Sequence, residues 1–328
     1  MNANIVGTGV YVPEKVVTND DLSRILGEDI NEFVTTVLGI RERHVCAENE
    51  STADLATTAS RQALAGACVQ AADLDLIILA TDTPEQLSPA TSVVVQHRLG
   101  ALNAGTFDVN SACAGFVTAL DTASKFIIAD PAYRNVLVVG AYAMSKYLDL
   151  HDKKTATIFA DGAGAVVLQA RDDQPGYLAG KLRADGSFHD HMGIYAGGTR
   201  MPITRQVIDE GVWNKVRFAK KYPAEVNTEG WPAIVEEVLA KARLRLDDVK
   251  LFLFTQVNLS TIREVMANLG LPMERTHTIM HKWGYTGSAC IPMVLHDAWV
   301  AGKLDHGDNV VMCASGGGLN MACVAFRW

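Results

Sequence analysis

The stretch Thr106-Phe-Asp-Val-Asn-Ser-Ala-Cys-Ala-Gly-Phe-Val-Thr-Ala-Leu-Asp-Thr-Ala-Ser-Lys-Phe126 decides how the rest of this chain is interpreted. It starts as a short extended run and continues as a helical pattern, because its apolar residues then recur at steps of three and four. Cys113 stands among small residues where the predicted strand becomes a helix. This setting predicts a nucleophile elbow, in which the helix dipole lowers the pKa of the thiol. The alternative is a buried cysteine that packs as a small hydrophobic residue.

Composition limits the class of protein. The 328 residues are 48% hydrophobic and 20% charged, with 27 glycines, as is typical of a well-buried α/β enzyme. A net charge of −8 argues against general affinity for nucleic acid or an anionic membrane, although an acidic protein can still dock on a local basic patch. The six cysteines show neither CxxC pairs nor zinc spacing, so we expect reduced thiols and no cofactor. We also expect no signal peptide and no membrane span, hence a cytoplasmic location.

The second half of the sequence repeats features of the first. Three pairs of segments correspond: 73–81 with 247–255, 106–126 with 277–299, and 135–140 with 309–314. This repeat predicts two similar βαβ-type halves, residues 1–170 and 171–328, with an irregular excursion at 171–231. The active site is then expected between the halves, near residues 81–83, 113, 255–258 and 284–287.

Local patterns predict the other elements. We expect an opening strand, four helices and a two-stranded hairpin around a glycine-rich turn. The strand is expected at 4–13 and the hairpin at 155–170. The helices are expected at 18–22 (a helix start), 51–68, 89–99 and 231–244.

The sequence resembles the thiolase superfamily, and most closely the β-ketoacyl-acyl-carrier-protein synthase III family. The shared motifs are Gly39-Ile-Arg-Glu-Arg-His44, the Cys113 elbow, Phe159-Ala-Asp-Gly-Ala-Gly-Ala165, Gly284-Tyr-Thr-Gly-Ser-Ala-Cys-Ile-Pro292 and Ser315-Gly-Gly-Gly-Leu319. The resemblance implies a five-layered αβαβα sandwich of two duplicated halves and a homodimer. It also implies acyl-CoA or an acyl-carrier protein as substrate.

The resemblance implies that Cys113 takes the acyl group. The backbone amides of Cys113 and Gly317 then form the oxyanion hole, because backbone donors in a glycine run can approach the thioester closely.

Two catalytic positions of the family carry other residues here. The family's Pro-His-Gln-Ala-Asn reads Phe254-Thr-Gln-Val-Asn258, so Thr255 takes the histidine position. The family's Gly-Asn-Thr reads Gly284-Tyr-Thr286, so Tyr285 takes the asparagine position. These groups normally stabilise the charge that develops as malonyl thioester loses carbon dioxide. We therefore expect weak malonyl decarboxylation, with Thr255 and Tyr285 as replacement donors.

Substrate-binding positions also follow from the resemblance. Phe33 corresponds to a tryptophan that binds coenzyme A in the family, and Lys153 corresponds approximately to a family arginine. Asn258 is the last residue of the altered histidine motif. Leu87 lies on the loop that limits the acyl pocket across the dimer. Because the segment around Leu87 has smaller side chains than the family, we expect a pocket that accepts a branched or longer acyl group.

A base near the acyl-cysteine has two candidates. Asp82 stands where hydroxymethylglutaryl-CoA synthases carry a catalytic glutamate, and its structural alternative is a turn residue after a buried strand. His281 lies in the predicted turn before Tyr285, whereas His277 is expected to pack in the strand. The pair His189 and His191 resembles a metal motif but lacks a third ligand, so we expect a surface loop and no metal site.

These features predict an acyltransferase that forms a thioester on Cys113. The second step is either a carbon–carbon condensation or transfer to an oxygen or nitrogen acceptor. One alternative is a non-decarboxylative condensation like that of hydroxymethylglutaryl-CoA synthase. Another is a non-catalytic subunit that pairs with an active homologue, although such a subunit has no physical need for an intact elbow and glycine run.

Overall fold

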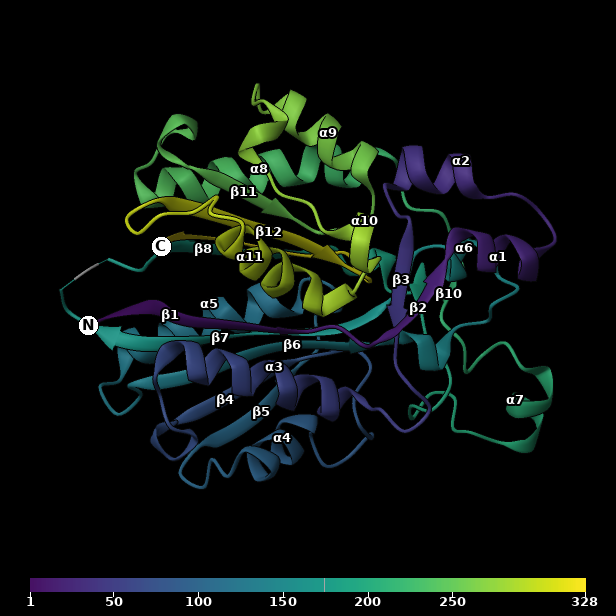
Figure 1. The fold of residues 1–328 in the computed structure, drawn as a ribbon, viewed down its shortest axis with the longest axis horizontal. Coiled ribbons are helices and arrows are strands. Elements are labelled where there is room, and N and C mark those ends of the chain that lie inside the picture. The colour runs from purple at the N-terminus through teal and green to yellow at the C-terminus, as the bar shows by residue number, and fades with distance from the viewer. Residues whose placement is uncertain (174) are drawn as a thin grey trace.

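The computed structural model describes residues 1–173 and 175–328, in which helices and sheets alternate as five layers (Figure 1). The strands of the first sheet pair in the order β1-β7-β6-β4-β5. Their bounds are Asn2–Tyr11 (β1), Asp161–Arg171 (β7), Asn135–Ala143 (β6), Leu76–Ala80 (β4) and Gly105–Val109 (β5). The apolar runs of β4 and β6 are buried along nearly their whole length, as expected for parallel strands covered on both faces.

The second sheet repeats this order with one strand fewer. Its strands pair as β11-β12-β13-β8. Their bounds are Leu251–Phe254 (β11), Asn309–Gly316 (β12), Asn320–Arg327 (β13) and Tyr177–Ala184 (β8). The strand predicted at the start of 277–299 does not form, and an isolated bridge between Phe252 and Thr276 occupies the corresponding edge. The duplication is therefore visible in the strand order but incomplete.

Six helices form the three helical layers of Figure 1. They are α3 (Thr52–Ala67) and α4 (Thr91–Leu99) outside the first sheet, α5 (Gly115–Ala129) and α11 (Cys290–Val300) between the sheets, and α8 (Glu225–Ala242) and α9 (Leu259–Asn268) outside the second. Helix α3 begins after a capping box at Ser51, as predicted, but α8 begins six residues before the predicted start at Trp231. This αβαβα sandwich confirms the predicted fold.

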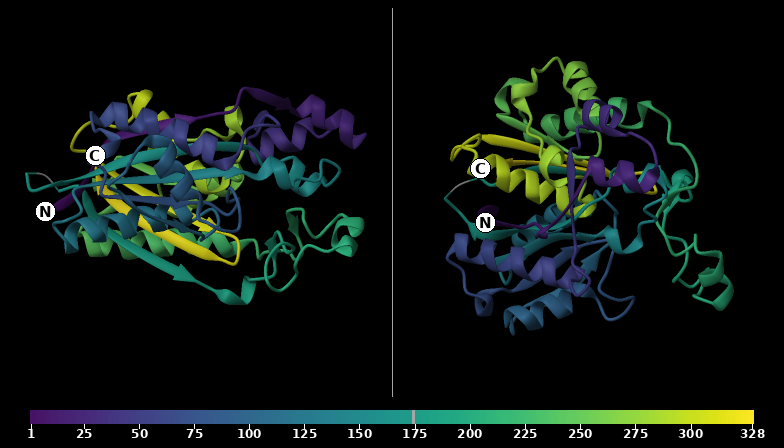
Figure 2. Two further views of the ribbon diagram at one scale, coloured as in Figure 1. Left: turned by 90° about the horizontal axis from the view of Figure 1, so that it is seen from below. Right: turned by 45° about the vertical axis from the view of Figure 1, so that its right-hand side comes forward.

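Short elements gather at one end of the molecule, opposite the chain termini (Figure 1). They are β2 (Lys15–Thr18), α1 (Asn19–Leu26), α2 (Asn31–Phe33), β3 (Glu42–Val45), α6 (Lys153–Ala156), β9 (Met192–Gly193), α7 (Arg205–Glu210), β10 (Arg217–Phe218) and α10 (Met280–Trp283). The segment around α7 projects from the body at this end (Figure 2). The predicted excursion at 171–231 thus includes strand β8 as well as this projecting segment.

The hairpin predicted at 155–170 is wrong. This stretch contains helix α6 and the single strand β7. Its glycines lie inside strand β7. A Cβ on Gly162 would lie 2.9 Å from the side chain of Met293, and one on Gly164 would lie 2.8 Å from the backbone of Met293. Close packing of β7 on α11, rather than a turn, accounts for these glycines.

The central helix α5 explains a second difference from expectation. The 18 residues Ala112–Ala129 have a mean hydropathy of 1.3, so one segment does have the length and composition of a membrane span. However, 61% of this segment is buried inside the protein, and α5 lies between the two sheets. Packing against two sheets accounts for its apolar composition.

The two halves share their cores. The strands of the first sheet end at Arg171 and those of the second begin at Tyr177. Nevertheless, Leu22, Val34 and Ile40 of the first half pack in the same buried cluster as Trp231 of the second half. A boundary at residue 170 therefore separates the sheets but not the hydrophobic cores.

Candidate active site

The segment between β5 and α5 holds Cys113 in a tight elbow. Its neighbour Ala112 has a φ of 47°, in the left-handed region that few non-glycine residues adopt. The side chain of Asn110 accepts a hydrogen bond from the Ala112 amide at 3.1 Å. The Cys113 side chain is only 3% exposed. The backbone therefore makes the sharp turn expected of a nucleophile elbow, and its strain is confined to the residue beside the cysteine.

The glycine run after β12 presses against this elbow. A Cβ on Gly316 would lie 2.5 Å from the carbonyl oxygen of Ser111 and 2.7 Å from the amide nitrogen of Cys113. Only glycine permits such an approach. The contact brings Gly317, the second predicted oxyanion donor, to the edge of the cavity that Cys113 lines.

Two cavities meet beside Cys113, because Met192 and Gly317 line both. The smaller, which we call the cysteine cavity, has a volume of about 190 Å³. Its lining includes Cys113, Phe159, Tyr222, Asn227, Tyr285 and Ser315. The larger, which we call the aspartate cavity, has a volume of about 480 Å³. Its lining includes Asp82, Asn110, Met144, His189, Ile194, Val216 and Asn320.

The electrostatics around Cys113 differ from the sequence prediction. Burial raises the pKa of the Cys113 thiol well above its ordinary value, and the negative charge of Asp82 raises it further. A hydrogen bond with Tyr285 acts in the opposite direction. The predicted low pKa is therefore wrong for the protein without substrate, because desolvation outweighs the stabilisation expected at a helix N-terminus.

Asp82 has one carboxylate oxygen that no described group contacts by a hydrogen bond. It follows strand β4, and its Oδ1 atom is buried with no hydrogen bond to any group in residues 1–173 or 175–328. Burial raises the pKa of Asp82 to about 6, although a hydrogen bond from its own amide lowers it slightly. The flanking side chains of Thr81 and Thr83 accept hydrogen bonds from backbone amides at 3.0 and 2.9 Å, so the loop is held in place around Asp82. Above a pH of about 6 the Asp82 carboxyl group is therefore mostly charged, and this charge acts on Cys113.

Tyr285 lies next to the cysteine. Its ring stacks on Phe159 with centroids 5.7 Å apart, and its phenol hydrogen-bonds with Cys113. Burial raises the pKa of Tyr285 well above its ordinary value, so the phenol stays neutral and able to donate.

Thr255 does not line either cavity. Its side chain is 1% exposed, and its hydroxyl oxygen accepts a hydrogen bond from the Ser315 amide at 3.0 Å. This contact joins the end of β11 to the end of β12. The position that the resemblance assigns to a catalytic histidine thus carries a side chain with a structural contact.

The structure does not place His281 at the site. His281 is exposed on α10 and lines neither cavity. Partial desolvation, together with the positive charges of Lys282 and Arg41, lowers its pKa. His277 contacts Asp297 at 2.7 Å. Sequence proximity to Tyr285 misled the prediction, because the left-handed Gly284 (φ 72°) turns the chain between them. Asp82 is the remaining candidate base.

The predicted substrate-binding residues lie outside both cavities. Asn258 caps helix α9, because its side-chain oxygen accepts hydrogen bonds from Ser260. Phe33 is 54% exposed on α2, and Lys153 forms a 3.0 Å ion pair with Glu28. Leu87 is 81% exposed on the loop after Asp82. The capping role of Asn258 accounts for its side-chain oxygen without a substrate.

Two polar residues at the site escaped the sequence analysis. Tyr222 and Asn227 line the cysteine cavity, yet both come from the irregular stretch 171–231, where no periodic pattern points to them. The only signal was the length of that stretch, which predicted a substrate-binding region without identifying residues.

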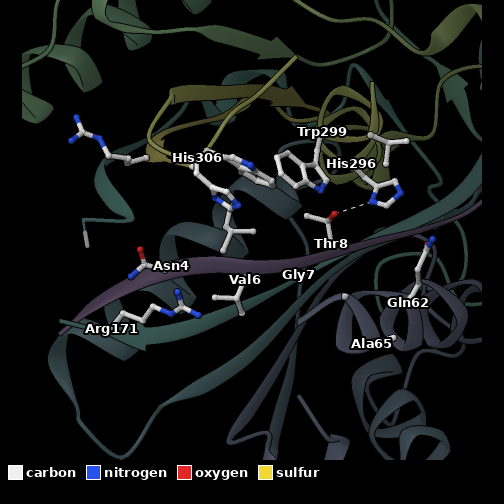
Figure 3. A pocket seen from close by; sticks show the side chains of 15 residues that line it. Asn4, Val6, Gly7, Thr8, Gln62, Ala65, Arg171, His296, Trp299 and His306 are labelled. Carbon is white, nitrogen blue, oxygen red and sulfur yellow. Dashed lines mark hydrogen bonds between the residues drawn. The ribbon is translucent and has the colours of Figure 1, made fainter. Parts of the chain in front are cut away.

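A still larger groove, of about 800 Å³, lies between β1 and α11 (Figure 3). Arg171, His306 and Trp299 surround it, and Thr8 hydrogen-bonds with His296 at 2.8 Å. None of its lining residues is shared with the two cavities near Cys113, and none is a cysteine. We therefore place the candidate chemistry at the smaller cavities.

Comparisons with known proteins place the chain among similar sequences over its whole length. The family model described as 3-oxoacyl-[acyl-carrier-protein (ACP)] synthase III matches residues 107–186, and the model of its C-terminal part matches residues 239–328. A β-ketoacyl-[acyl-carrier-protein] synthase III of Syntrophomonas wolfei is 36% identical, with 100% of this chain and 98% of the relative covered.

Solved structures give the same result. The 3-oxoacyl-[acyl-carrier-protein] synthase III of Aquifex aeolicus has a TM-score of 0.91 and 36% identity, with 99% of this chain and 100% of that chain covered. The priming β-ketosynthase of the R1128 polyketide pathway has a TM-score of 0.91 and 29% identity, with 99% and 96% covered.

Proposed function

This chain belongs to the 3-oxoacyl-[acyl-carrier-protein] synthase III family of acyl-transferring condensing enzymes, and we propose that it accepts an acyl group on Cys113 and then uses Asp82, rather than malonyl decarboxylation, to generate the second nucleophile. The observation that carries this proposal is the buried, unpartnered Oδ1 of Asp82, whose charge acts on Cys113. A structural carboxylate is normally hydrogen-bonded, so one that is buried without a partner indicates a functional group.

In the first half-reaction, the sulfur of Cys113 attacks the carbonyl carbon of a thioester. A bond forms between that carbon and Sγ, the bond to the donor sulfur breaks, and the donor leaves as a thiol with the cysteine proton. The amides of Cys113 and Gly317 would hold the oxyanion, and Tyr285 would stabilise the thiolate.

In the second half-reaction, Asp82 would remove a proton from the group that reacts next. Above its pKa of about 6 the carboxylate is charged and can accept that proton. The proton comes either from the α-carbon of a thioester, as in a non-decarboxylative condensation, or from an acceptor hydroxyl or amine. In each route the new nucleophile would attack the acyl carbon on Cys113, the bond between that carbon and Sγ would break, and the released sulfur would take the proton from Asp82.

Decarboxylation has less support in this site. It requires two donors at the malonyl carbonyl, but the Thr255 hydroxyl contacts the Ser315 amide and lies outside the cavity lining. Tyr285 is the single donor left of the two replaced positions. Losing one donor at these positions typically lowers a rate by about a hundredfold or more, so malonyl turnover would depend on other donors of the cavity.

The proposal extends to the assembly and its substrates. Strand β5 is an edge of the first sheet, and Leu87 and Leu102 nearby are each 81% exposed. An exposed strand edge with apolar neighbours supports a homodimer formed there. We propose that this dimer acts in the cytoplasm on acyl-CoA or acyl-carrier protein. Phe33 and Lys153 would contact the incoming carrier. Sedimentation of a monomer at micromolar concentration would contradict the dimer.

Intact-protein mass spectrometry tests the function. The protein is incubated with acetyl, longer, branched and malonyl thioesters of coenzyme A and carrier protein, and carbon dioxide release is followed in parallel. We expect acyl adducts on Cys113 with little carbon dioxide from malonyl thioester. Rapid carbon dioxide release would return the protein to decarboxylative condensation, and the absence of any adduct would favour a non-catalytic subunit.

A further inference from the structure

We propose that Tyr222 and Asn227 bind the carbonyl oxygen of a second thioester in the cysteine cavity. The inference rests on the proposed function in one respect, namely that a second substrate enters beside an acylated Cys113. It assigns substrate-binding roles to two residues and a chemical class, a thioester, to that substrate.

The arrangement of Tyr222 leaves its proton free. The phenol oxygen accepts a hydrogen bond from the amide of Gly318 at 3.3 Å, but within residues 1–173 and 175–328 the hydroxyl donates to no protein group. The ring is held by stacking on Phe188, with centroids 5.6 Å apart and planes 12° apart. Burial raises the pKa of Tyr222 and the Gly318 amide lowers it, and a thiolate at Cys113 would raise it further, so the phenol stays neutral. Tyr222 is thus a fixed donor.

Asn227 is oriented in the same way. Its side-chain oxygen accepts a hydrogen bond from the Ser315 hydroxyl at 2.8 Å. This contact fixes the amide plane, and the amide nitrogen donates to no group in the described part of the chain. Because Asn227 lies in the first turn of α8, close in sequence to Tyr222, the same stretch of backbone carries both donors.

The two donors anchor to the glycine run that supplies the oxyanion hole. Asn227 is held by Ser315, two residues before Gly317, and Tyr222 is held by Gly318, the residue after it. All of them line or border the cavity that contains Cys113 and Tyr285. Once the Cys113 acyl carbonyl occupies the first oxyanion hole, the free donors suit a second carbonyl oxygen.

A thioester fits this cavity better than a charged acceptor. The named polar atoms are neutral donors, and most of the other lining residues are apolar, including Phe159, Phe218, Val226 and Val257. A neutral carbonyl group satisfies the donors without placing a charge among apolar side chains.

The experiment uses the full-length Cys113→Gln variant, whose side-chain carbonyl stands in for that of an acyl-cysteine and which cannot be acylated. Two unreactive probes are compared by calorimetry: S-acetonyl-CoA, which has a ketone oxygen, and S-isobutyl-CoA, which has a methyl group in its place. We expect the ketone to bind about tenfold more tightly, since a hydrogen bond of ordinary strength accounts for that ratio.

Adding Tyr222→Phe or Asn227→Leu should remove most of the tenfold preference and leave S-isobutyl-CoA binding nearly unchanged. Tyr195→Phe is the matched control, because the Tyr195 hydroxyl bonds to the carbonyl of Asp190 and Tyr195 lines neither cavity. Equal weakening of both probes, or no change in the preference, would overturn the assignment. Because no turnover is needed, this outcome is independent of whether Asp82 acts as a base.

In the protein with Cys113 intact, Tyr222→Phe should lower turnover with a second thioester at least tenfold more than it lowers single-turnover acylation of Cys113, mainly through a higher KM. An equal loss in both half-reactions would indicate a role in general packing and contradict the proposal.

Discussion

The ends of strands β4 and β11 occupy equivalent places in the two halves but differ in one side chain. Thr81 and Asp82 follow β4, and Thr255 and Gln256 follow β11. Both threonines accept hydrogen bonds from backbone amides at 3.0 Å, so the duplicated position is structural in each half. The next residues, Asp82 and Gln256, differ in whether their side chains are paired by hydrogen bonds.

Gln256 is fully satisfied. Its amide nitrogen donates to the carbonyl of Phe254 at 2.8 Å, and its oxygen accepts from the amide of Ile279 at 2.9 Å. Asp82 has a buried oxygen with no partner in the described residues and a pKa raised to about 6. The comparison shows that the two equivalent junctions differ in hydrogen bonding, and we propose that the Asp82 junction serves catalysis.

The largest effect is expected at the cysteine that the β4 junction faces. Cys113→Ala should abolish the acyl adduct seen by mass spectrometry, because the attacking sulfur is lost. Cys68→Ser is the control, since Cys68 is exposed and distant in sequence from the elbow. Uptake of label by Cys113→Ala would contradict the assignment.

Iodoacetamide gives a second view of that cysteine. We now expect Cys68 to react before Cys113 in the substrate-free protein, which reverses the expectation drawn from the helix dipole alone. Cys68 is exposed, whereas Cys113 is 3% exposed and burial raises the pKa of its thiol. Peptide mapping after brief alkylation would check the order.

Asp82→Asn should lower the second half-reaction about a hundredfold or more while Cys113 still becomes acylated. Removing the negative charge also removes one cause of the raised thiol pKa, so acylation is expected to be retained or faster. In the unaltered protein the second step should rise as pH passes through about 6, where Asp82 ionises, and this dependence should vanish in the variant. An unchanged second step in Asp82→Asn would break the comparison.

A smaller effect is expected from rebuilding the family's residues at the β11 end. Thr255→His combined with Tyr285→Asn should raise carbon dioxide release from malonyl thioester by about tenfold, because two donors would again face the carbonyl. The gain is limited because the Ser315 amide loses its hydrogen bond to Thr255. Either single change is the control and should give less. No gain in the double variant would show that something other than this pair limits decarboxylation.

The smallest effect concerns the stability of the two junctions. Because the pKa of Asp82 is about 6 in the folded protein and near 4 when unfolded, folded molecules bind more protons between these values. Stability is therefore lost as pH rises from about 4 to 6, and Asp82→Asn should recover roughly 2–3 kcal/mol at pH 8 but almost nothing near pH 4.

Gln256→Leu provides the matched contrast. It leaves the Phe254 carbonyl and the Ile279 amide unpaired, so it should destabilise the protein by about 1–3 kcal/mol at every pH. Urea unfolding of both variants at pH 4.5 and 8 measures these effects. Equal pH dependence of the two variants would contradict the assigned difference.

The sequence by itself predicted two similar βαβ-type halves and the elbow at Cys113, and its resemblance to the synthase III family implied the five-layered sandwich. The halves and the elbow follow from local patterns, namely apolar runs, caps and small residues, which act within a few turns of the chain. The glycines of β7 and the missing strand before α11 were misjudged, because close packing between layers, rather than local preference, decides them.

Only the tertiary structure decided which polar groups reach the cysteine. His281 is near Tyr285 in the sequence but is exposed in the structure. Tyr222 and Asn227 lie in an irregular stretch where no sequence pattern identified them, yet they line the cysteine cavity. The raised pKa of Cys113 and the unpartnered oxygen of Asp82 likewise have no local signature. Desolvation and hydrogen-bond satisfaction depend on everything that packs around a group, and most of those neighbours come from distant parts of the chain.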